Sequence, residues 1–179
     1  TARMRDQDKR TMAMKGDPAI IRTLNAVLTN ELTAVNQYFL HARMFESWGL
    51  KHLGQVIYGE SIGEMKHADM LIKRVLFLDG LPNLQDLHKL HIGENAIECL
   101  GADLQLELGS RETLLPAIVQ CEEARDFVSR EILVHILSDT EEHIDFLETQ
   151  HLLIRQLGEQ NYLQSAMTEI GPDKSASGN

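Results

Sequence analysis

The sequence predicts an all-α fold, a four-helix bundle with a long crossover between helices two and three and a short C-terminal fifth helix. Four long segments repeat apolar residues at steps of three and four, the spacing of one face of an α-helix. No useful length of chain alternates apolar and polar residues as a strand does. The stretch 80–94 lacks helical period, and a connection of this length lets the flanking helices run parallel.

The first two helices are defined by their ends. Asp17 is expected to cap the first helix, with Pro18 at its first position, where the missing N–H is tolerated. The second helix is expected over about 50–78, because Gly80 and Pro82 follow it and both residue types end helices. The apolar stripe of the first helix comprises Leu24, Leu28, Val35, Tyr38, Ala42 and Phe45. That of the second helix comprises Leu53, Ile57, Leu71, Val75 and Leu78.

The last helices follow the crossover. The third is expected to kink at Pro116, and the fourth to end at Gly158, before a short fifth helix at about 159–168. The third stripe comprises Ile97, Leu100, Leu104, Leu114, Ile118 and Cys121, and the fourth Val128, Ile132, Ile136, Phe146, Leu147, Leu153 and Leu157. Polar residues 1–13 are expected to be a disordered extension and 171–179 a flexible tail, around one domain at 14–170.

Composition excludes two classes of partner. A length of 179 residues suits one domain with a single core. The formal net charge of −10 argues against nucleic-acid binding, which needs a basic surface. No apolar run approaches the ~18 to 20 residues that cross a bilayer, so no membrane association is expected. Because the N-terminus lacks an apolar secretory core, the expected location is cytoplasmic.

Charged and imidazole side chains interrupt the apolar stripes of all four helices. The interrupting residues are Glu31, Glu64, His67, Glu107 and His143. Charged residues are rarely buried unless they are paired or bind a metal. Five such residues on four core faces therefore need compensating partners.

The spacing of these residues predicts a metal site. Glu64 and His67 are three residues apart, which places a carboxylate and an imidazole on one helical face. The interval of 33 residues from Glu31 to Glu64 recurs between Glu107 and Thr140, three residues before the histidine of the fourth helix. The two halves of the chain thus superpose as a repeat. Carboxylate and imidazole ligands suit iron or manganese better than a thiolate-preferring metal.

Several motifs resemble those of the bacterioferritins. They are MKGD at 14–17, NEL at 30–32, QYFLHARM at 37–44, ESI at 60–62, EMKHAD at 64–69 and EHID at 142–145, together with residues 78–84. The resemblance covers about 14–170. It implies a ferritin-like bundle that assembles into a twenty-four-subunit hollow shell, takes up Fe(II), oxidises it at a dinuclear iron site and stores ferric mineral.

The resemblance also implies roles for individual residues. The catalytic iron ligands would be Glu31, Glu64, His67, Glu107 and His143, with Glu64 and Glu107 bridging and Tyr38 as a neighbouring aromatic. A haem b shared between two subunits would take one axial thioether, that of Met65, from each subunit. Its pocket would include Leu32, Asn36, Phe39 and Tyr58. A ferredoxin-like reductant and a homo-oligomeric or mixed shell are expected partners.

Two positions depart from the family pattern. Thr140 stands where the second Glu-x-x-His places its glutamate, and threonine offers no anionic oxygen. Glu141 and Glu142 point away from His143 at ~100° per residue, while Asp139 faces nearly the right way and is an alternative, shorter ligand. Bacterioferritins with an inner-surface iron site use histidine and aspartate where this chain has Gly59 and Gly63, so that route is expected to be absent.

Other functions stay open from these residues. Because Thr140 weakens the iron site, the chain is alternatively a haem-binding structural or electron-transfer subunit with an impaired ferroxidase centre that co-assembles with an intact one. A rubrerythrin or manganese catalase relative is a further candidate, although paired CxxC motifs are absent. A plain helical interaction module leaves the buried ligands unexplained. The remaining histidines, including His41 and His135, have no partner at ligand spacing and are expected at the surface or in loops.

Overall fold

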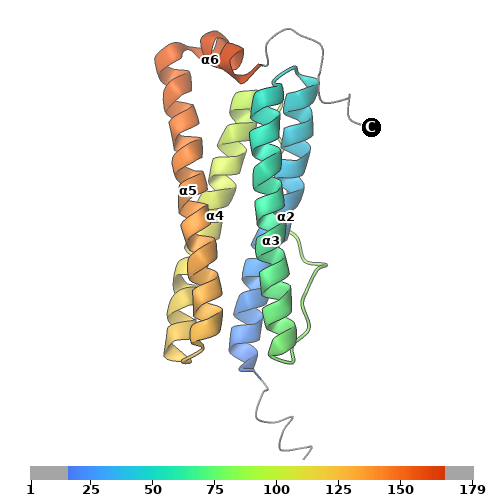
Figure 1. The fold of residues 1–179 in the computed structure, drawn as a ribbon, viewed down its shortest axis with the longest axis vertical. Coiled ribbons are helices and arrows are strands. Elements are labelled where there is room, and N and C mark those ends of the chain that lie inside the picture. The colour runs from blue at the N-terminus through green and yellow to red at the C-terminus, as the bar shows by residue number, and fades with distance from the viewer. Residues whose placement is uncertain (1–15, 168–179) are drawn as a thin grey trace, which may run out of the picture.

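The computed structural model describes residues 16–167 of the chain (Figure 1). The expected extension at 1–13 and tail at 171–179 lie outside the described residues and stay predictions. The helices are α2 Pro18–Ser47, α3 Lys51–Phe77, α4 Ala96–Glu123, α5 Phe127–Leu157 and α6 Glu159–Ala166. None of the helices in this part of the chain is long and apolar enough to span a bilayer.

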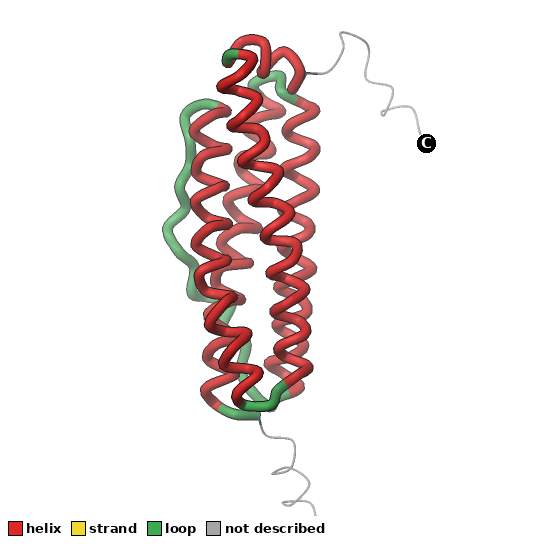
Figure 2. Tube along the Cα trace, turned by 90° about the vertical axis from the view of Figure 1, so that its left-hand side faces the viewer, coloured by secondary structure: helices red, strands yellow, loops and turns green. Residues whose placement is uncertain are grey.

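The four long helices form a bundle of two antiparallel pairs. α2 packs along α3, and α4 packs along α5. Contacts between α2 and α4 hold the two pairs together. The segment between α3 and α4 runs along the outside of the bundle from one end to the other (Figure 2). α3 and α4 therefore point the same way, as the sequence predicted. The short α6 lies across the end of the bundle at which α5 finishes (Figure 1).

Side-chain caps begin three of the long helices. The Asp17 carboxylate accepts a hydrogen bond from the Ala19 N–H at 2.7 Å, and Pro18 is the first residue of α2, as predicted. Asn95 and Asp126 cap α4 and α5 in the same way. Gly158, with φ of 78°, ends α5 in a backbone conformation that glycine adopts without steric cost. Pro116 lies inside α4 and does not end it, and the kink expected there stays a prediction.

The apolar core is divided into two clusters, one toward each end of the bundle. The first is built around Leu24, Leu28, Leu71, Val75, Leu114, Leu133 and Ile136. The second is built around Tyr38, Phe45, Ile57, Leu100 and Leu147. Each long helix contributes to both clusters, so each passes through the zone that separates them. Polar side chains from all four helices meet in this zone.

A buried polar network fastens the crossover to the bundle. The Nδ1 of His41 lies 2.8 Å from Asp103 Oδ1, and the Gln37 amide donates to the same oxygen at 2.9 Å. The crossover backbone donates to both α2 side chains, from Gly93 N–H to His41 Nε2 and from His91 N–H to Gln37. The expectation that His41 lies at the surface is wrong. It is fully buried, because it follows the buried tyrosine of α2 by one helical turn.

Candidate metal centre

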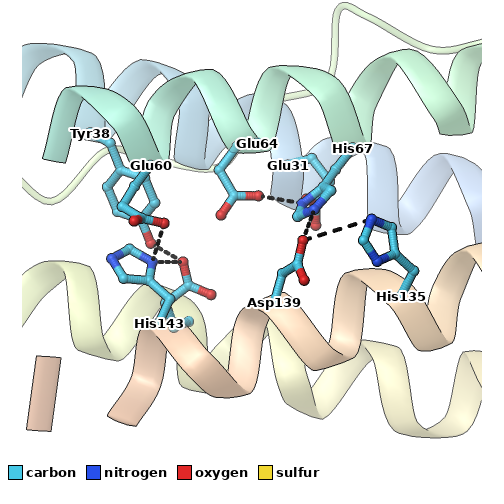
Figure 3. Close-up of polar contacts among 9 residues, drawn as sticks. Glu31, Tyr38, Glu60, Glu64, His67, His135, Asp139 and His143 are labelled. Carbon is cyan, nitrogen blue, oxygen red and sulfur yellow. Dashed lines mark hydrogen bonds and ion pairs between the residues drawn. The ribbon is translucent and has the colours of Figure 1, made fainter. Parts of the chain in front are cut away.

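The five residues that interrupt the apolar stripes meet in the zone between the two core clusters. α2 contributes Glu31, α3 contributes Glu64 and His67, α4 contributes Glu107, and α5 contributes His143. All five are less than 9% exposed. Figure 3 labels four of these side chains, all but that of α4, and shows them in the space between the helices. The helical periodicity and the repeat spacing of the sequence thus correctly predicted which residues would come together.

One group of possible ligands lies nearer the first core cluster. The Nδ1 of His67 is 3.0 Å from Glu31 Oε2 and 3.0 Å from Glu64 Oε2. One ligand atom from each of these three residues lies within 4.8 Å of the others, which is close enough to surround a single cation. The three side chains come from two helices that pack along their length, so their separation is set by the contact of α2 with α3.

A second group lies nearer the other cluster. The Nδ1 of His143 is 2.9 Å from Glu107 Oε1, and the Tyr38 hydroxyl donates a hydrogen bond to the same oxygen. The Tyr38 ring also meets the His143 ring edge to face, with centroids 5.1 Å apart. Glu64 completes this group, with one ligand atom from each residue again within 4.8 Å. Tyr38 is therefore the neighbouring aromatic that the resemblance implied.

Glu64 belongs to both groups, whereas Glu107 belongs to one. This geometry places Glu64 within reach of both groups and Glu107 within reach of one. The expectation that Glu64 and Glu107 both bridge two irons stays a prediction. The α5 position that repeats Glu64 in the second half of the chain is Thr140, which is 4% exposed and carries no charged oxygen.

The electrostatics of the centre follow from burying several carboxylates together. Burial and the nearby Glu31 raise the pKa of Glu64 to about 8. Burial also raises the pKa of Glu107 above its ordinary value, against the opposing effect of its bond to His143. Burial alone lowers the pKa of His67, but its bonds to the two carboxylates outweigh this and raise it to about 11.

The donor set fits a divalent cation that prefers oxygen and nitrogen. Within residues 16–167 the carboxylates of the centre pair with histidines, and no lysine or arginine forms an ion pair with them. A buried carboxylate is costly without a positive partner. Three carboxylates and two imidazoles from four facing helices match the ligand type of dinuclear iron or manganese sites.

Asp139, the alternative ligand expected beside Thr140, hydrogen-bonds to His67 in this structure, and its role as an iron ligand stays a prediction. Its Oδ2 accepts a hydrogen bond from His67 Nε2 at 2.9 Å, on the side of the ring that faces away from Glu31 and Glu64. Asp139 belongs to neither of the two buried groups. The hydrogen bond holds the orientation of the His67 ring, as outer carboxylates commonly do for metal-binding histidines.

Sequence reasoning missed Glu60 as a member of this site. Its Oε2 lies 3.9 Å from His143 Nδ1, and burial raises its pKa. Its side chain is 40% exposed, so it stands at the edge of the centre between solvent and His143. The sequence spacing could have identified Glu60, because it precedes Glu64 by one helical turn and lies on the same helical face.

The residues expected around a haem lie on α2 and α3, and three of them are exposed while Leu32 and Tyr58 are partly buried. They are Leu32, Asn36, Phe39, Tyr58 and Met65. Met65 is 52% exposed and faces out of the bundle, as predicted. The rings of Phe39 and Tyr58 lie 6.1 Å apart, and the Arg43 guanidinium lies over both. The contribution of Arg43 was not predicted.

Comparison with known proteins places these observations in a family context. A family model described as the ferritin-like domain matches residues 21–157. The bacterioferritin of Mycobacterium leprae is 48% identical over 149 residues, which cover 83% of this chain and 94% of that protein. The bacterioferritin of Brucella melitensis is 46% identical over 84% of this chain and 94% of its own length. That of Streptomyces coelicolor is 43% identical over 92% of this chain and 99% of its own length.

Proposed function

Since this chain belongs to the bacterioferritins within the ferritin-like family, we propose that it is a shell subunit that takes up Fe(II), oxidises it at the buried centre and stores ferric mineral. Iron storage is the function of the family, and its members are generally ferroxidase-active. One observation supports oxidation at this centre in this chain. Five buried carboxylate and imidazole side chains converge from four helices, and among the described residues no lysine or arginine pairs with these carboxylates.

The protein side chains of the centre have separate tasks. Glu31 and His67 would hold one Fe(II), Glu107 and His143 would hold the other, and Glu64 is within reach of both positions. Fe(II), once bound, supplies the electrons that pass to dioxygen or peroxide. The apolar clusters on either side keep bulk water out, which strengthens the attraction between the carboxylates and the cations.

Iron loading tests this function directly. Apoprotein is mixed with Fe(II) in air and separated by size-exclusion chromatography. We expect iron to elute with a particle many times larger than a single chain, and the loading to stay at a few ions per chain when dioxygen is excluded. Elution as a monomer without iron in both conditions contradicts the proposal.

A second candidate function is favoured by Thr140. We propose that this subunit binds haem between paired copies and, because its iron centre lacks a carboxylate, co-assembles with a subunit whose ligand set is complete. The exposed thioether of Met65 supplies one axial ligand from each copy, and the aromatic strip of Phe39 and Tyr58 supplies apolar contacts. An isologous pair of subunits suits a ligand held on a two-fold axis. A ferredoxin-like reductant that delivers electrons through this haem is part of the same proposal.

Met65→Leu tests haem ligation. Leucine keeps the apolar volume but removes the sulfur, so we expect the haem absorbance per chain to fall to near zero while shell assembly is retained. Met70→Leu is the matched control, because Met70 lies on the same helix and is only partly buried against the first core cluster. Full haem absorbance in the Met65→Leu protein contradicts the assignment.

A further inference from the structure

A third group of possible metal ligands lies beside the buried centre, toward solvent. It comprises His135 and Asp139 of α5 and the Nε2 side of His67 on α3. The Oδ2 of Asp139 is 2.9 Å from His67 Nε2 and 3.8 Å from His135 Nε2. The two imidazole rings meet edge to face with centroids 5.7 Å apart. Figure 3 shows Asp139 rising from α5 with dashed lines to both rings.

The ligand types in this group are those that divalent transition metals prefer. Two imidazoles and one carboxylate with open positions form the donor set of many Fe(II) sites. One ligand atom from each of the three residues lies within 4.8 Å of the others, so no large movement is needed to surround one ion. The sequence shows that His135 and Asp139 are one helical turn apart. It does not show that His67, which lies on another helix, faces them.

The exposed fraction of the side chain falls from the outermost residue of the group to the innermost. The His135 side chain is 54% exposed, that of Asp139 is 43% exposed, and that of His67 is 7% exposed. A cation that arrives from solvent therefore meets His135 and Asp139 before it reaches His67. The other side of the His67 ring faces Glu31 and Glu64, so this one imidazole separates the solvent side from the buried centre.

We propose that His135, Asp139 and the Nε2 of His67 form an outer cation site, which binds a divalent transition metal from solvent and shares His67 with the buried centre. The inference rests on the proposed function only in that the buried centre binds the same ion. The outer site adds His135 and Asp139 as ligands on the His67 side of the buried centre.

The two sites use different ring nitrogens of His67, and only one of these nitrogens can bind a cation at a time. A neutral imidazole offers one lone pair, and its other nitrogen carries a proton. When Nε2 binds an outer cation, the Nδ1–H still donates to Glu31 or Glu64. When Nδ1 binds an inner cation, the Nε2–H still donates to Asp139. Either tautomer leaves the ring fully hydrogen-bonded, so a cation can move from the outer to the inner side of one residue.

Co(II) titration of the full chain tests the outer site, because Co(II) is redox-stable and its visible spectrum reports its ligands. The background is Glu64→Gln, which removes the carboxylate common to both buried groups and leaves the outer ligands intact. In this background we expect Co(II) to bind, and His135→Ala to weaken that binding by about tenfold or more. His52→Ala is the matched control, because His52 is an exposed histidine on α3 outside the group, and it should change nothing.

Cobalt-edge anomalous diffraction from crystals of the Glu64→Gln protein provides the second measurement. A peak in contact with His135 and Asp139 supports the outer site. Equal Co(II) affinity with and without His135 overturns it. The buried centre is judged separately, by whether Glu64→Gln lowers the number of ions bound relative to the wild-type chain. The outer site and the proposed function can therefore fail independently.

Discussion

Thr140→Glu is expected to speed Fe(II) oxidation by about 10- to 100-fold over the wild-type chain, a range set by what a supporting group contributes at a metal site. Thr140 is buried on α5, one turn before His143. A glutamate there restores the pattern that Glu64 and His67 form on α3. The two cations then share a carboxylate on both sides, and the second position holds its ion more tightly.

The measurement is stopped-flow absorbance of the ferric product after Fe(II) is mixed with aerated protein. Thr140→Gln is the matched control, because glutamine has the length of glutamate without its charge, and its rate should stay near that of the wild-type chain. If the wild-type and Thr140→Glu proteins oxidise Fe(II) at the same rate, the missing carboxylate is not what limits the centre. In that case the mixed-shell proposal loses its main support.

Most residues of this centre could be predicted from the sequence, because they recur at the spacing of one helical face. The apolar stripe of each helix identified the face on which Glu31, Glu64, Glu107 and His143 would lie, and burial confirmed all four. The repeat interval further indicated that the two helix pairs would present these residues at matching heights. The crossover between α3 and α4, recognised by its lack of period, placed the helices in the observed directions.

What the sequence could not predict depends on how neighbouring helices are rotated against each other. Periodicity along one helix gives no information about which residue of another helix a side chain meets. His41 therefore went unrecognised as the partner of Asp103, and His135 as a neighbour of His67. The distinction between Glu64 and Glu107 has the same origin, because the two groups that contain Glu64 draw residues from four helices.

Glu64→Gln is expected to weaken cation binding at both buried positions by about 100-fold or more, since it removes a ligand rather than a supporting group. Glu107→Gln should weaken only the position near His143, because Glu107 belongs to one group. Calorimetric titration with Co(II) distinguishes these outcomes by the number of ions bound. Glu142→Gln, an exposed change on α5, is the control and should bind as the wild-type chain does. Equal losses in the two variants contradict the assignment of Glu64 as the shared ligand.

The same substitution should also change how the stability of the apoprotein depends on pH. The pKa of Glu64 rises from 4.5 to about 8 on folding, so the folded chain binds the extra proton between these values. Wherever the folded state binds more protons, the free energy of unfolding falls as pH rises. The stability that Glu64 contributes is thus complete below pH 4.5 and is lost as pH rises through about 8. Glutamine does not titrate, so this loss should be absent in Glu64→Gln.

A smaller decline should remain in the variant above pH 6.5, because the folded state raises the pKa of His67 from 6.5 to about 11 and Glu31 still accepts its hydrogen bond. Thermal unfolding of metal-free protein from pH 4 to pH 9 measures both effects. A curve for Glu64→Gln that parallels the wild-type curve over the whole range contradicts the expectation. Bound Fe(II) should also remove the decline, because a cation replaces the protons as the positive partner of the carboxylates. The mutual repulsion of the buried carboxylates is therefore the physical reason to expect that the centre binds a cation.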